Sequence, residues 1–467
     1  MKQKQFQFIK YSIVIITVII IYACEKENYN KKDFINTIEK TYSEINNFKT
    51  IEINYDRINY NAYQSYNYKE PDSLILNNRI QINDTKNYFS SRIASFPGDF
   101  KFSQQEFQND TINFAYDSLG IVFGRAILKQ DLNRYQQVKQ EVNQLLDYRV
   151  IQEMIDNKDS ISILEKLASK NLIIAKIYKS DDTISYTFDS KSLQLISLEK
   201  SESNEKWKFN LFKKSFSRNI KYYRNKELKF EYRINDVKEL KEIPKNNLKL
   251  PINIDAGNII DYPEMEISFI SKNLYLVKNV ARDRNVLFKI NNKDIMVFGA
   301  PISDKISKQV VSLINNSFPN KKIISVYISH SHSDHIGGLS FYAEKEVNIF
   351  ADEYTIEAIK EYPKFKNKIN KFSFKSIKNS EVRDGVKYYI PKNTHSVGQS
   401  FVYFLENDVL YQGDFLEIAK DNTLPHHINE TAKTFISFLK ANNIKPKRII
   451  GHHRNDNIDL KFIDLIE

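Results

Sequence analysis

Residues 330–335 read HSHSDH, and residues 336–338 that follow read IGG. Residues 323–328 (IISVYI) precede this motif and are rich in β-branched side chains, which predicts a buried strand. On an extended backbone, residues i and i+2 point to one side, so His330 and His332 should face the same way at the strand's end. The chain must then turn, and the two glycines allow that turn and a close helix start. The turn brings Asp334 and His335 round from a second direction.

Histidine is concentrated around this motif. The chain has eight histidines, and none precedes His330. The others are His332, His335, His395, His426, His427, His452 and His453. Imidazoles and a carboxylate that converge from two directions suit a borderline divalent ion such as zinc. The alternative is a loop of ordinary polar residues, but apolar strands seldom end in such a group unless the site is chemical.

The pattern H-x-H-x-D-H, after a strand and before two glycines, resembles the signature of the metallo-β-lactamase fold hydrolases. Three later motifs follow in that family's order: residues 394–398 (THSVG), 412–414 (QGD) and 451–452 (GH). They resemble the segments with the third histidine, the bridging carboxylate and the last ligand. The resemblance implies the family's αββα sandwich, with metals at one edge between two sheets.

The resemblance also implies a ligand set for two zinc ions per chain. His330, His332 and His395 would hold one zinc; Asp334, His335 and His452 would hold the other; Asp414 would bridge them. Two such metals share a water and make it hydroxide near neutral pH, which attacks a carbonyl carbon or phosphorus. Asp334 is also the candidate catalytic carboxylate.

Several of these positions have alternatives. His395 could be a loop histidine, Asp414 could belong to a turn, and His453 stands beside His452. His426 and His427 could contact substrate or lie on the surface.

Two departures from the family's pattern narrow the prediction. One group of true β-lactamases of this fold has cysteine at the second metal, whereas this chain has Asp414 there and only one cysteine. The family's frequent aspartate after the second strand is replaced by Gly299, which puts support of the metal ligands in doubt.

The N-terminus resembles a bacterial lipoprotein signal. Lys2, Lys4 and Lys10 precede a short apolar run over residues 11–23, and Cys24 follows it. The resemblance implies cleavage before Cys24 and a lipid on its thiol, so that residues 1–23 are a signal peptide and 24–32 a tether. The body would then be exported and anchored in the cell envelope. The alternative is an uncleaved N-terminal anchor with an incidental cysteine.

Composition excludes few functions. The 467 residues allow two or three domains, and the single cysteine rules out an intrachain disulfide. The net charge of +11 comes with no compact Arg-rich run with interleaved aromatic residues, so we expect no nucleic-acid partner.

Residues 33–241 show no recognisable chemistry but many alternating stretches. Strands with one wet face are predicted at 50–55, 80–82, 111–116, 172–178, 185–188, 193–198, 206–209 and 228–232. Helices are predicted at 34–47 and within 133–155. We expect a β-rich N-terminal domain with an antiparallel sheet and a few helices. Residues 242–265 contain Pro244, Pro251 and Pro263 among polar residues, which predicts a linker between the two domains. Residues 266–467 would form the hydrolase domain, which makes the chain α+β.

The sequence therefore predicts an exported, membrane-anchored zinc hydrolase that cleaves an ester, thioester, lactone, amide or phosphodiester. Its substrate would be a small or envelope-derived molecule. Two alternatives stay open: an envelope ligand-binding lipoprotein whose metal domain is not catalytic, and a β-lactam hydrolase.

Overall fold

The computed structural model describes residues 26–28, 30–42, 49–131, 133–167, 170–179, 181–213 and 216–466. The predicted signal peptide and Cys24 lie outside the described residues. Within these ranges, no helix has the length and apolar character needed to cross a bilayer.

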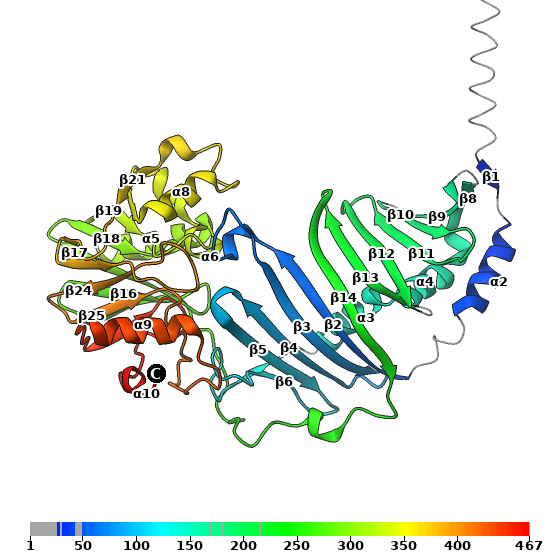
Figure 1. Cartoon of the computed structure of the whole chain (residues 1–467), viewed down its shortest axis with the longest axis horizontal. Helices are drawn as coiled ribbons and strands as arrows, with labels where there is room; N and C mark the ends of the chain where they lie inside the picture. The colour runs from blue at the N-terminus through cyan, green and yellow to red at the C-terminus, as the bar shows by residue number, and fades with distance from the viewer. Residues whose placement is uncertain are drawn as a thin grey trace, which may run out of the picture. The chain divides into compact units, whose positions relative to one another are not determined.

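The chain forms two compact units (Figure 1). The N-terminal unit comprises the residues up to Asn59, Asn78–Tyr88 and Asn133–Ile243, and the C-terminal unit comprises Tyr60–Asn77, Phe89–Leu132 and Pro244–Glu467. Two segments of the predicted N-terminal region thus belong to the unit that contains the histidine motif. The strands β3 (Ser73–Asn83) and β4 (Tyr88–Phe96) have residues in both units.

The N-terminal unit is built on an antiparallel sheet. Its strands, in spatial order, are β1 (Lys26–Asn28), β8 (Ile161–Leu167), β9 (Leu172–Tyr178), β10 (Thr183–Asp189), β11 (Leu195–Lys200), β12 (Glu205–Lys213), β13 (Phe216–Arg224), β14 (Glu227–Glu239) and β2 (Thr50–Tyr60). Every neighbouring pair in this series runs antiparallel. Burial alternates along β9 and β10, as expected for strands with one face against a core.

Helices cover the buried face of this sheet. They are α2 (Lys31–Tyr42), α3 (Arg134–Leu145) and α4 (Asp147–Asp156), and η3 (Lys158–Ser160) follows. Val138 and Val142 lie one helical turn apart on α3 and pack into the same core as Phe188 of β10. Burial of each such side chain stabilises the unit by roughly 1.5–3 kcal/mol.

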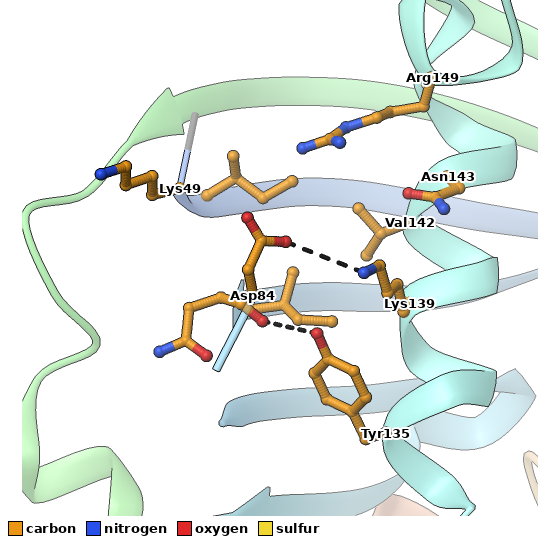
Figure 2. Close-up of a pocket in the computed structure, with 10 residues that line it drawn as sticks. Lys49, Asp84, Tyr135, Lys139, Val142, Asn143 and Arg149 are labelled. Carbon is orange, nitrogen blue, oxygen red and sulfur yellow. Dashed lines mark hydrogen bonds and ion pairs between the residues drawn. The ribbon is translucent and has the colours of Figure 1, made fainter. Parts of the chain in front are cut away.

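A small hollow lies beside α3 in the N-terminal unit (Figure 2). Tyr135 donates a hydrogen bond to the carbonyl of Asn83 at 2.7 Å, and Lys139 lies 3.8 Å from Asp84. The hollow has a volume of about 20 Å³. That is room for about one water molecule, so the hollow is no ligand site.

The C-terminal unit contains two larger sheets. One has the order β15 (Glu266–Ser271), β16 (Leu274–Val280), β17 (Arg284–Asn291), β18 (Asp294–Phe298), β19 (Lys322–Tyr327), β20 (Asn348–Ala351) and β21 (Ser373–Ser376). It is antiparallel up to β18 and parallel from β18 to β21. The other has the order β22 (Val382–Arg383), β23 (Val386–Tyr389), β24 (Phe401–Phe404), β25 (Val409–Gln412) and β26 (Arg448–Gly451), and its last pair is parallel.

Shorter elements complete this unit. The antiparallel strands β5 (Phe100–Gln108), β6 (Asn113–Tyr116) and β7 (Ile127–Lys129) come from the segment 89–132. The helices are α5 (Asp304–Ser317), α6 (Ser333–Ile336), α7 (Leu339–Ala343), α8 (Glu353–Glu361), α9 (Glu430–Ala441) and α10 (Phe462–Leu465). The 3-10 turns are η1 (Ala62–Gln64), η2 (Pro97–Asp99), η5 (Lys245–Leu248) and η6 (Ile369–Lys371). Ser303, Asp352 and Asn429 cap α5, α8 and α9 by accepting backbone N–H groups.

The two sheets share one apolar core, and helices pack on their other faces. Phe298 of β18 and Phe404 of β24 meet in the shared core with ring centroids 5.0 Å apart. A second core joins β18 and β19 to α5 and α8, and a third joins β24 and β25 to α9. The carboxyl ends of parallel strands meet at one edge of a sheet, so this arrangement gathers the residues after β18, β19, β25 and β26.

The β-rich N-terminal region with few helices is confirmed, as is the sheet-and-helix character of the C-terminal part. Differences lie at element ends. The helix predicted over 34–47 is α2, which begins at Lys31 and ends at Tyr42. The strand predicted over 193–198 begins at Leu195, because Leu193 lies in the turn of the β10–β11 hairpin with a φ of 56°.

Candidate metal centre

The histidine motif lies where β19 ends and the short helix α6 begins. Two glycines set this geometry by the space they leave. A Cβ on Gly337 would meet the carbonyl oxygen of Ile302 at 2.1 Å, and one on Gly338 would meet Oγ of Ser307 at 2.0 Å. Their φ values of −58° and −99° are ordinary, so close approach to the start of α5, rather than the backbone conformation, requires glycine.

The predicted ligands converge from four separate stretches of chain. One group of potential ligand atoms contains His330, His332, His395 and Asp414; a second contains His335, His452 and His453; a third contains Asp414, Glu417 and His453. Within each group the ligand atoms lie within 4.8 Å of one another. The structure therefore brings together six of the seven predicted metal ligands, adds His453, and leaves Asp334 beside these groups.

The first group has imidazoles held by outer partners. His330 Nδ1 lies 3.1 Å from Oγ of Ser329, and His332 Nε2 lies 3.1 Å from the carbonyl oxygen of Ser65. A carbonyl accepts only, so His332 carries its proton on Nε2 and turns Nδ1 toward the cluster. Burial lowers the pKa of His332 to about 3 and that of His330 well below its usual value. Both rings are therefore neutral, which is the state that binds a metal.

Asp414 lies between the first two groups, just after β25. Its Oδ2 is 3.2 Å from Nε2 of both His335 and His395 and 3.7 Å from Nε2 of His330, and its Oδ1 is 3.1 Å from Nε2 of His453. Burial raises the pKa of Asp414, but His335 and His453 outweigh it and hold the pKa well below its usual range. An ionised carboxylate between two sets of imidazoles can serve both.

Tyr411 supports His452 next to Gly299, the position where the family frequently has an aspartate. A Cβ on Gly299 would lie 3.3 Å from the hydroxyl of Tyr411 and 3.5 Å from Nδ1 of His452. That hydroxyl lies 2.8 Å from Nδ1 of His452, 2.9 Å from the carbonyl oxygen of Asn285 and 3.0 Å from that of Phe298. The hydroxyl donates its one proton to a carbonyl and so accepts from Nδ1–H, which leaves Nε2 to face the cluster. Tyr411 thus provides the support that the missing side chain at 299 cannot.

Asp334 makes contacts of a different kind. Its Oδ1 accepts a hydrogen bond from Nε2 of Gln64 at 2.8 Å, and its Oδ2 lies 3.2 Å from Nη2 of Arg284. Its Oδ2 is farther from the imidazoles, at 3.8 Å from Nε2 of His335 and 3.7 Å from Nε2 of His453. Burial raises the pKa of Asp334, but His335, His453 and Arg284 outweigh it and keep the carboxyl ionised.

A cavity of about 160 Å³ opens onto the cluster. Its lining includes His395, Asp414 and His453, charged residues such as Arg284 and Glu417, and three aromatic residues of the segment 89–132: Phe96, Phe100 and Phe102. The ring of Phe100 packs on that of His395 with centroids 4.6 Å apart. Gly98, with a φ of 76°, lets η2 approach this loop, since its Cβ would meet the carbonyl oxygen of Thr394 at 2.7 Å. Aromatic rings therefore form part of the cavity lining next to His395.

His426 and His427 do not line this cavity. His426 is exposed, and His427 Nε2 lies 2.8 Å from the carbonyl oxygen of Asp99, an acceptor in the segment 89–132. The sequence left open whether these histidines contact substrate or lie on the surface. Neither of them is among the described residues that line the cavity.

Sequence reasoning missed several residues of the centre. Gln64, Ser65 and Phe100 lie hundreds of positions from the motif in regions without a metal-binding pattern, and Arg284 and Glu417 gave no signal. His453 was visible as the neighbour of His452 and was treated as the alternative to it. The doublet itself was the only signal in the sequence that could have identified a further ligand.

The residues present fit a bound metal. In the part of the chain that the structure describes, Nε2 of His330, Nε2 and Nδ1 of His395, and Nε2 of His452 are buried and make no hydrogen bond. Each such orphaned polar atom costs about 1–3 kcal/mol. His330, His332 and His395, whose ligand atoms lie within 4.8 Å of one another and of that of Asp414, form a donor set suited to zinc or a similar ion.

Comparison with known proteins agrees with this chemistry. Residues 299–453 match the family described as the metallo-beta-lactamase superfamily. No curated protein was found to match the chain.

Among solved structures, DIM-1 metallo-beta-lactamase is 17% identical, with 44% of this chain and 96% of that chain covered and a TM-score of 0.34. A metallo-beta-lactamase from Hirschia baltica is 14% identical over 43% of this chain and 95% of that one, also with a TM-score of 0.34. TMB-1 is 17% identical over 44% and 95%, with a TM-score of 0.33. The stretch that matches the family model, 299–453, holds all four histidine and aspartate motifs.

Proposed function

We propose that this chain is a metal-dependent hydrolase that binds two zinc ions and cleaves an ester, thioester, lactone, amide or phosphodiester. The observation that carries the proposal is the set of buried imidazole nitrogens in this centre that make no hydrogen bond within the described residues. A buried set of this kind would destabilise the fold if nothing bound to it.

The proposed ligand set follows the residues that the structure groups. His330, His332 and His395 would hold one zinc, His335 and His452 would belong to the other, and Asp414 would contact both. Bound zinc supplies an activated water and polarises the oxygen that gains charge during hydrolysis. We further propose the family's αββα arrangement for the two sheets and their covering helices.

The chain's own residues hold this centre in place. Tyr411 fixes the ring of His452, Ser65 fixes that of His332, and Phe100 packs on that of His395. Such outer contacts orient ligand rings and set which nitrogen faces the metal. Phe96, Phe100 and Phe102 in the cavity lining would favour substrates with an apolar group.

Export and anchoring remain part of the proposal. The basic start, apolar run and Cys24 support a lipid anchor in the bacterial cell envelope. Intact-mass analysis of protein purified from membranes tests this: a mass that lacks residues 1–23 and includes a diacylglycerol supports it, and an unmodified full-length mass contradicts it.

Metal content and turnover together test the enzyme proposal. The full-length protein, purified in detergent, should contain about two zinc ions per chain and hydrolyse part of a panel of ester, thioester, lactone, phosphodiester and β-lactam substrates. A chelator should abolish turnover, and added zinc should restore it. Less than half an equivalent of metal, with no turnover after zinc is added, would contradict the proposal and favour the ligand-binding alternative. Turnover confined to β-lactams would instead single out the β-lactam hydrolase reading.

A further inference from the structure

We infer that His453 is a ligand of the second metal and that Asp334 is held away from that metal by Arg284 and Gln64. This inference rests on the proposed metal centre and departs from the ligand set that the family resemblance implied. It concerns which side chains of this chain complete the second site.

The backbone after β26 is shaped to turn both members of the histidine doublet toward the cluster. Successive residues of a strand point to opposite faces, so two adjacent histidines on an extended strand could not share a site. Here β26 ends at Gly451, whose Cβ would meet the carbonyl oxygen of His453 at 2.8 Å. The chain folds back there, and the N–H of Gly451 donates to the carbonyl of Asn455. As a result, the rings of His452 and His453 lie 5.1 Å apart, and both lie close to His335.

The distances around His453 are those of ligands that share an ion. Its Nε2 lies 3.3 Å from Nε2 of His335 and 3.1 Å from Oδ1 of Asp414. Two ligand atoms at a tetrahedral zinc with bonds of about 2.0–2.1 Å are about 3.3 Å apart. His335, His452 and His453 also have their ligand atoms within 4.8 Å of one another, and Asp414 adjoins them.

Asp334 has both oxygens engaged by the chain itself. Gln64 donates to Oδ1 at 2.8 Å, and Arg284 lies 3.2 Å from Oδ2. Arg284 also pairs with Asp283 at 2.8 Å, which fixes its guanidinium in place. If Asp334 turned to a metal, the partly buried Arg284 would lose one of its two carboxylate partners and keep only Asp283. Asp334 belongs to none of the three groups of convergent ligand atoms found among the described residues.

The second site is therefore completed by the imidazoles of His335, His452 and His453 and by the shared carboxylate of Asp414. Asp334 lines the cavity and positions the guanidinium of Arg284. This division explains why the chain has two consecutive histidines where one ligand would suffice.

Metal binding by matched variants tests this inference without relying on activity. Zinc content and affinity would be measured by chelator competition for the full-length protein, for His453→Ala and for Asp334→Asn, with exposed His426→Ala as the control. We expect His453→Ala to retain one zinc and to bind the second more than about 100-fold more weakly, because it loses a direct ligand rather than an outer support. Asp334→Asn and His426→Ala should retain two.

Cobalt substitution gives a second readout, since a four-coordinate site with imidazole ligands absorbs visible light strongly. His453→Ala should lose about half of this absorption, and added free imidazole should restore part of it. If His453→Ala does not fold, as judged by circular dichroism, His453→Gln serves as the variant.

The possible outcomes are distinct. Two tightly bound zinc ions in His453→Ala would overturn the inference while the proposed hydrolase stands. Loss of the second zinc from Asp334→Asn would overturn the assignment of Asp334 to Arg284 and Gln64. Absence of zinc from the unmodified protein would reject the proposed function itself.

Discussion

The two compact units bury charged groups in opposite ways. In the N-terminal unit, Glu52 is 3% exposed, and the chain supplies its cations: Lys238 at 2.8 Å and Arg79 at 2.9 Å. Burial raises the pKa of Glu52, but hydrogen bonds from Lys238, Gln81 and Arg79 outweigh it and lower the pKa to about 2. In the C-terminal unit, Asp414 is surrounded by imidazoles instead, and several of their nitrogens have no hydrogen-bond partner among the described residues.

This difference shows how a structural charge is distinguished from a functional one. Glu52 is complete within its own unit, because fixed cations compensate for its burial. The cluster around Asp414 is incomplete in the same sense, because Nε2 of His330 and both ring nitrogens of His395 are buried and make no hydrogen bond within the described residues. Burial alone would have singled out both carboxylates; only the chemistry of the neighbours separates them.

The largest expected effect comes from removing one imidazole of the first group. His395→Ala takes away a buried ring whose Nε2 lies 3.2 Å from Asp414, so it should reduce hydrolysis by about 10³-fold or more, the equivalent of several kcal/mol of transition-state stabilisation. Zinc content and turnover measure this effect. The exposed His426→Ala is the matched control and should change neither. Normal turnover of His395→Ala with one zinc fewer would show that the first metal is not needed for catalysis.

A smaller effect is expected from the pH dependence of Asp147, a buried carboxyl of the N-terminal unit. Burial raises its pKa to about 7. Between about pH 4 and 7 the unfolded chain gives up this proton and the folded chain keeps it, so the free energy of unfolding should fall as pH rises through this range. The expected fall is about 2–4 kcal/mol, complete above about pH 7.

Tryptophan fluorescence measures this transition, because the only tryptophan of the chain, Trp207, lies in the N-terminal unit. Urea denaturation at several pH values should show a smaller pH dependence in Asp147→Asn, whereas Asp156→Asn, an exposed change on the same helix, should keep it. Equal pH dependence in Asp147→Asn and the unmodified protein would show that another group is responsible.

The sequence predicted the features that depend on short stretches of residues, namely single strands and the ligand motifs. The strand predicted over 172–178 is β9 with the same bounds, and the strand predicted over 185–188 lies inside β10. The ligand motifs were visible because each is a short run of chemically distinctive residues at a strand end.

The supports of the centre were not predictable in this way. Ser65 contributes only a carbonyl, which every residue has, and Phe100 looks like any aromatic residue of a sheet. Their roles depend on contacts between segments that are hundreds of residues apart, and a single sequence does not record such contacts. For the same reason the doublet of His452 and His453 could be seen, but the turn that directs both rings inward could not.

The smallest effect sharpens the comparison between a ligand and its support. Tyr411→Phe keeps the ring in its buried position and removes the hydroxyl that accepts from Nδ1 of His452. Burial raises the pKa of Tyr411 well above 10, so this hydroxyl keeps its proton and its role does not vary at ordinary pH. Loss of such an outer partner weakens metal affinity by about 10–100-fold, less than loss of a ligand. Chelator competition should therefore show weaker binding of one zinc with two still bound at saturation.

Tyr388→Phe is the matched control, because Tyr388 is equally buried in the core between the same two sheets and donates only to the sulfur of Met296 at 3.8 Å among the contacts described. It should leave zinc affinity unchanged. If Tyr411→Phe also left the affinity unchanged, the ring of His452 would be held by packing alone, and the hydroxyl would not substitute for the side chain that Gly299 lacks. If Tyr411→Phe removed one zinc altogether, loss of this supporting hydroxyl would weaken zinc binding as much as loss of a ligand. The metal centre would then require its outer hydrogen bonds as Glu52 requires Lys238 and Arg79.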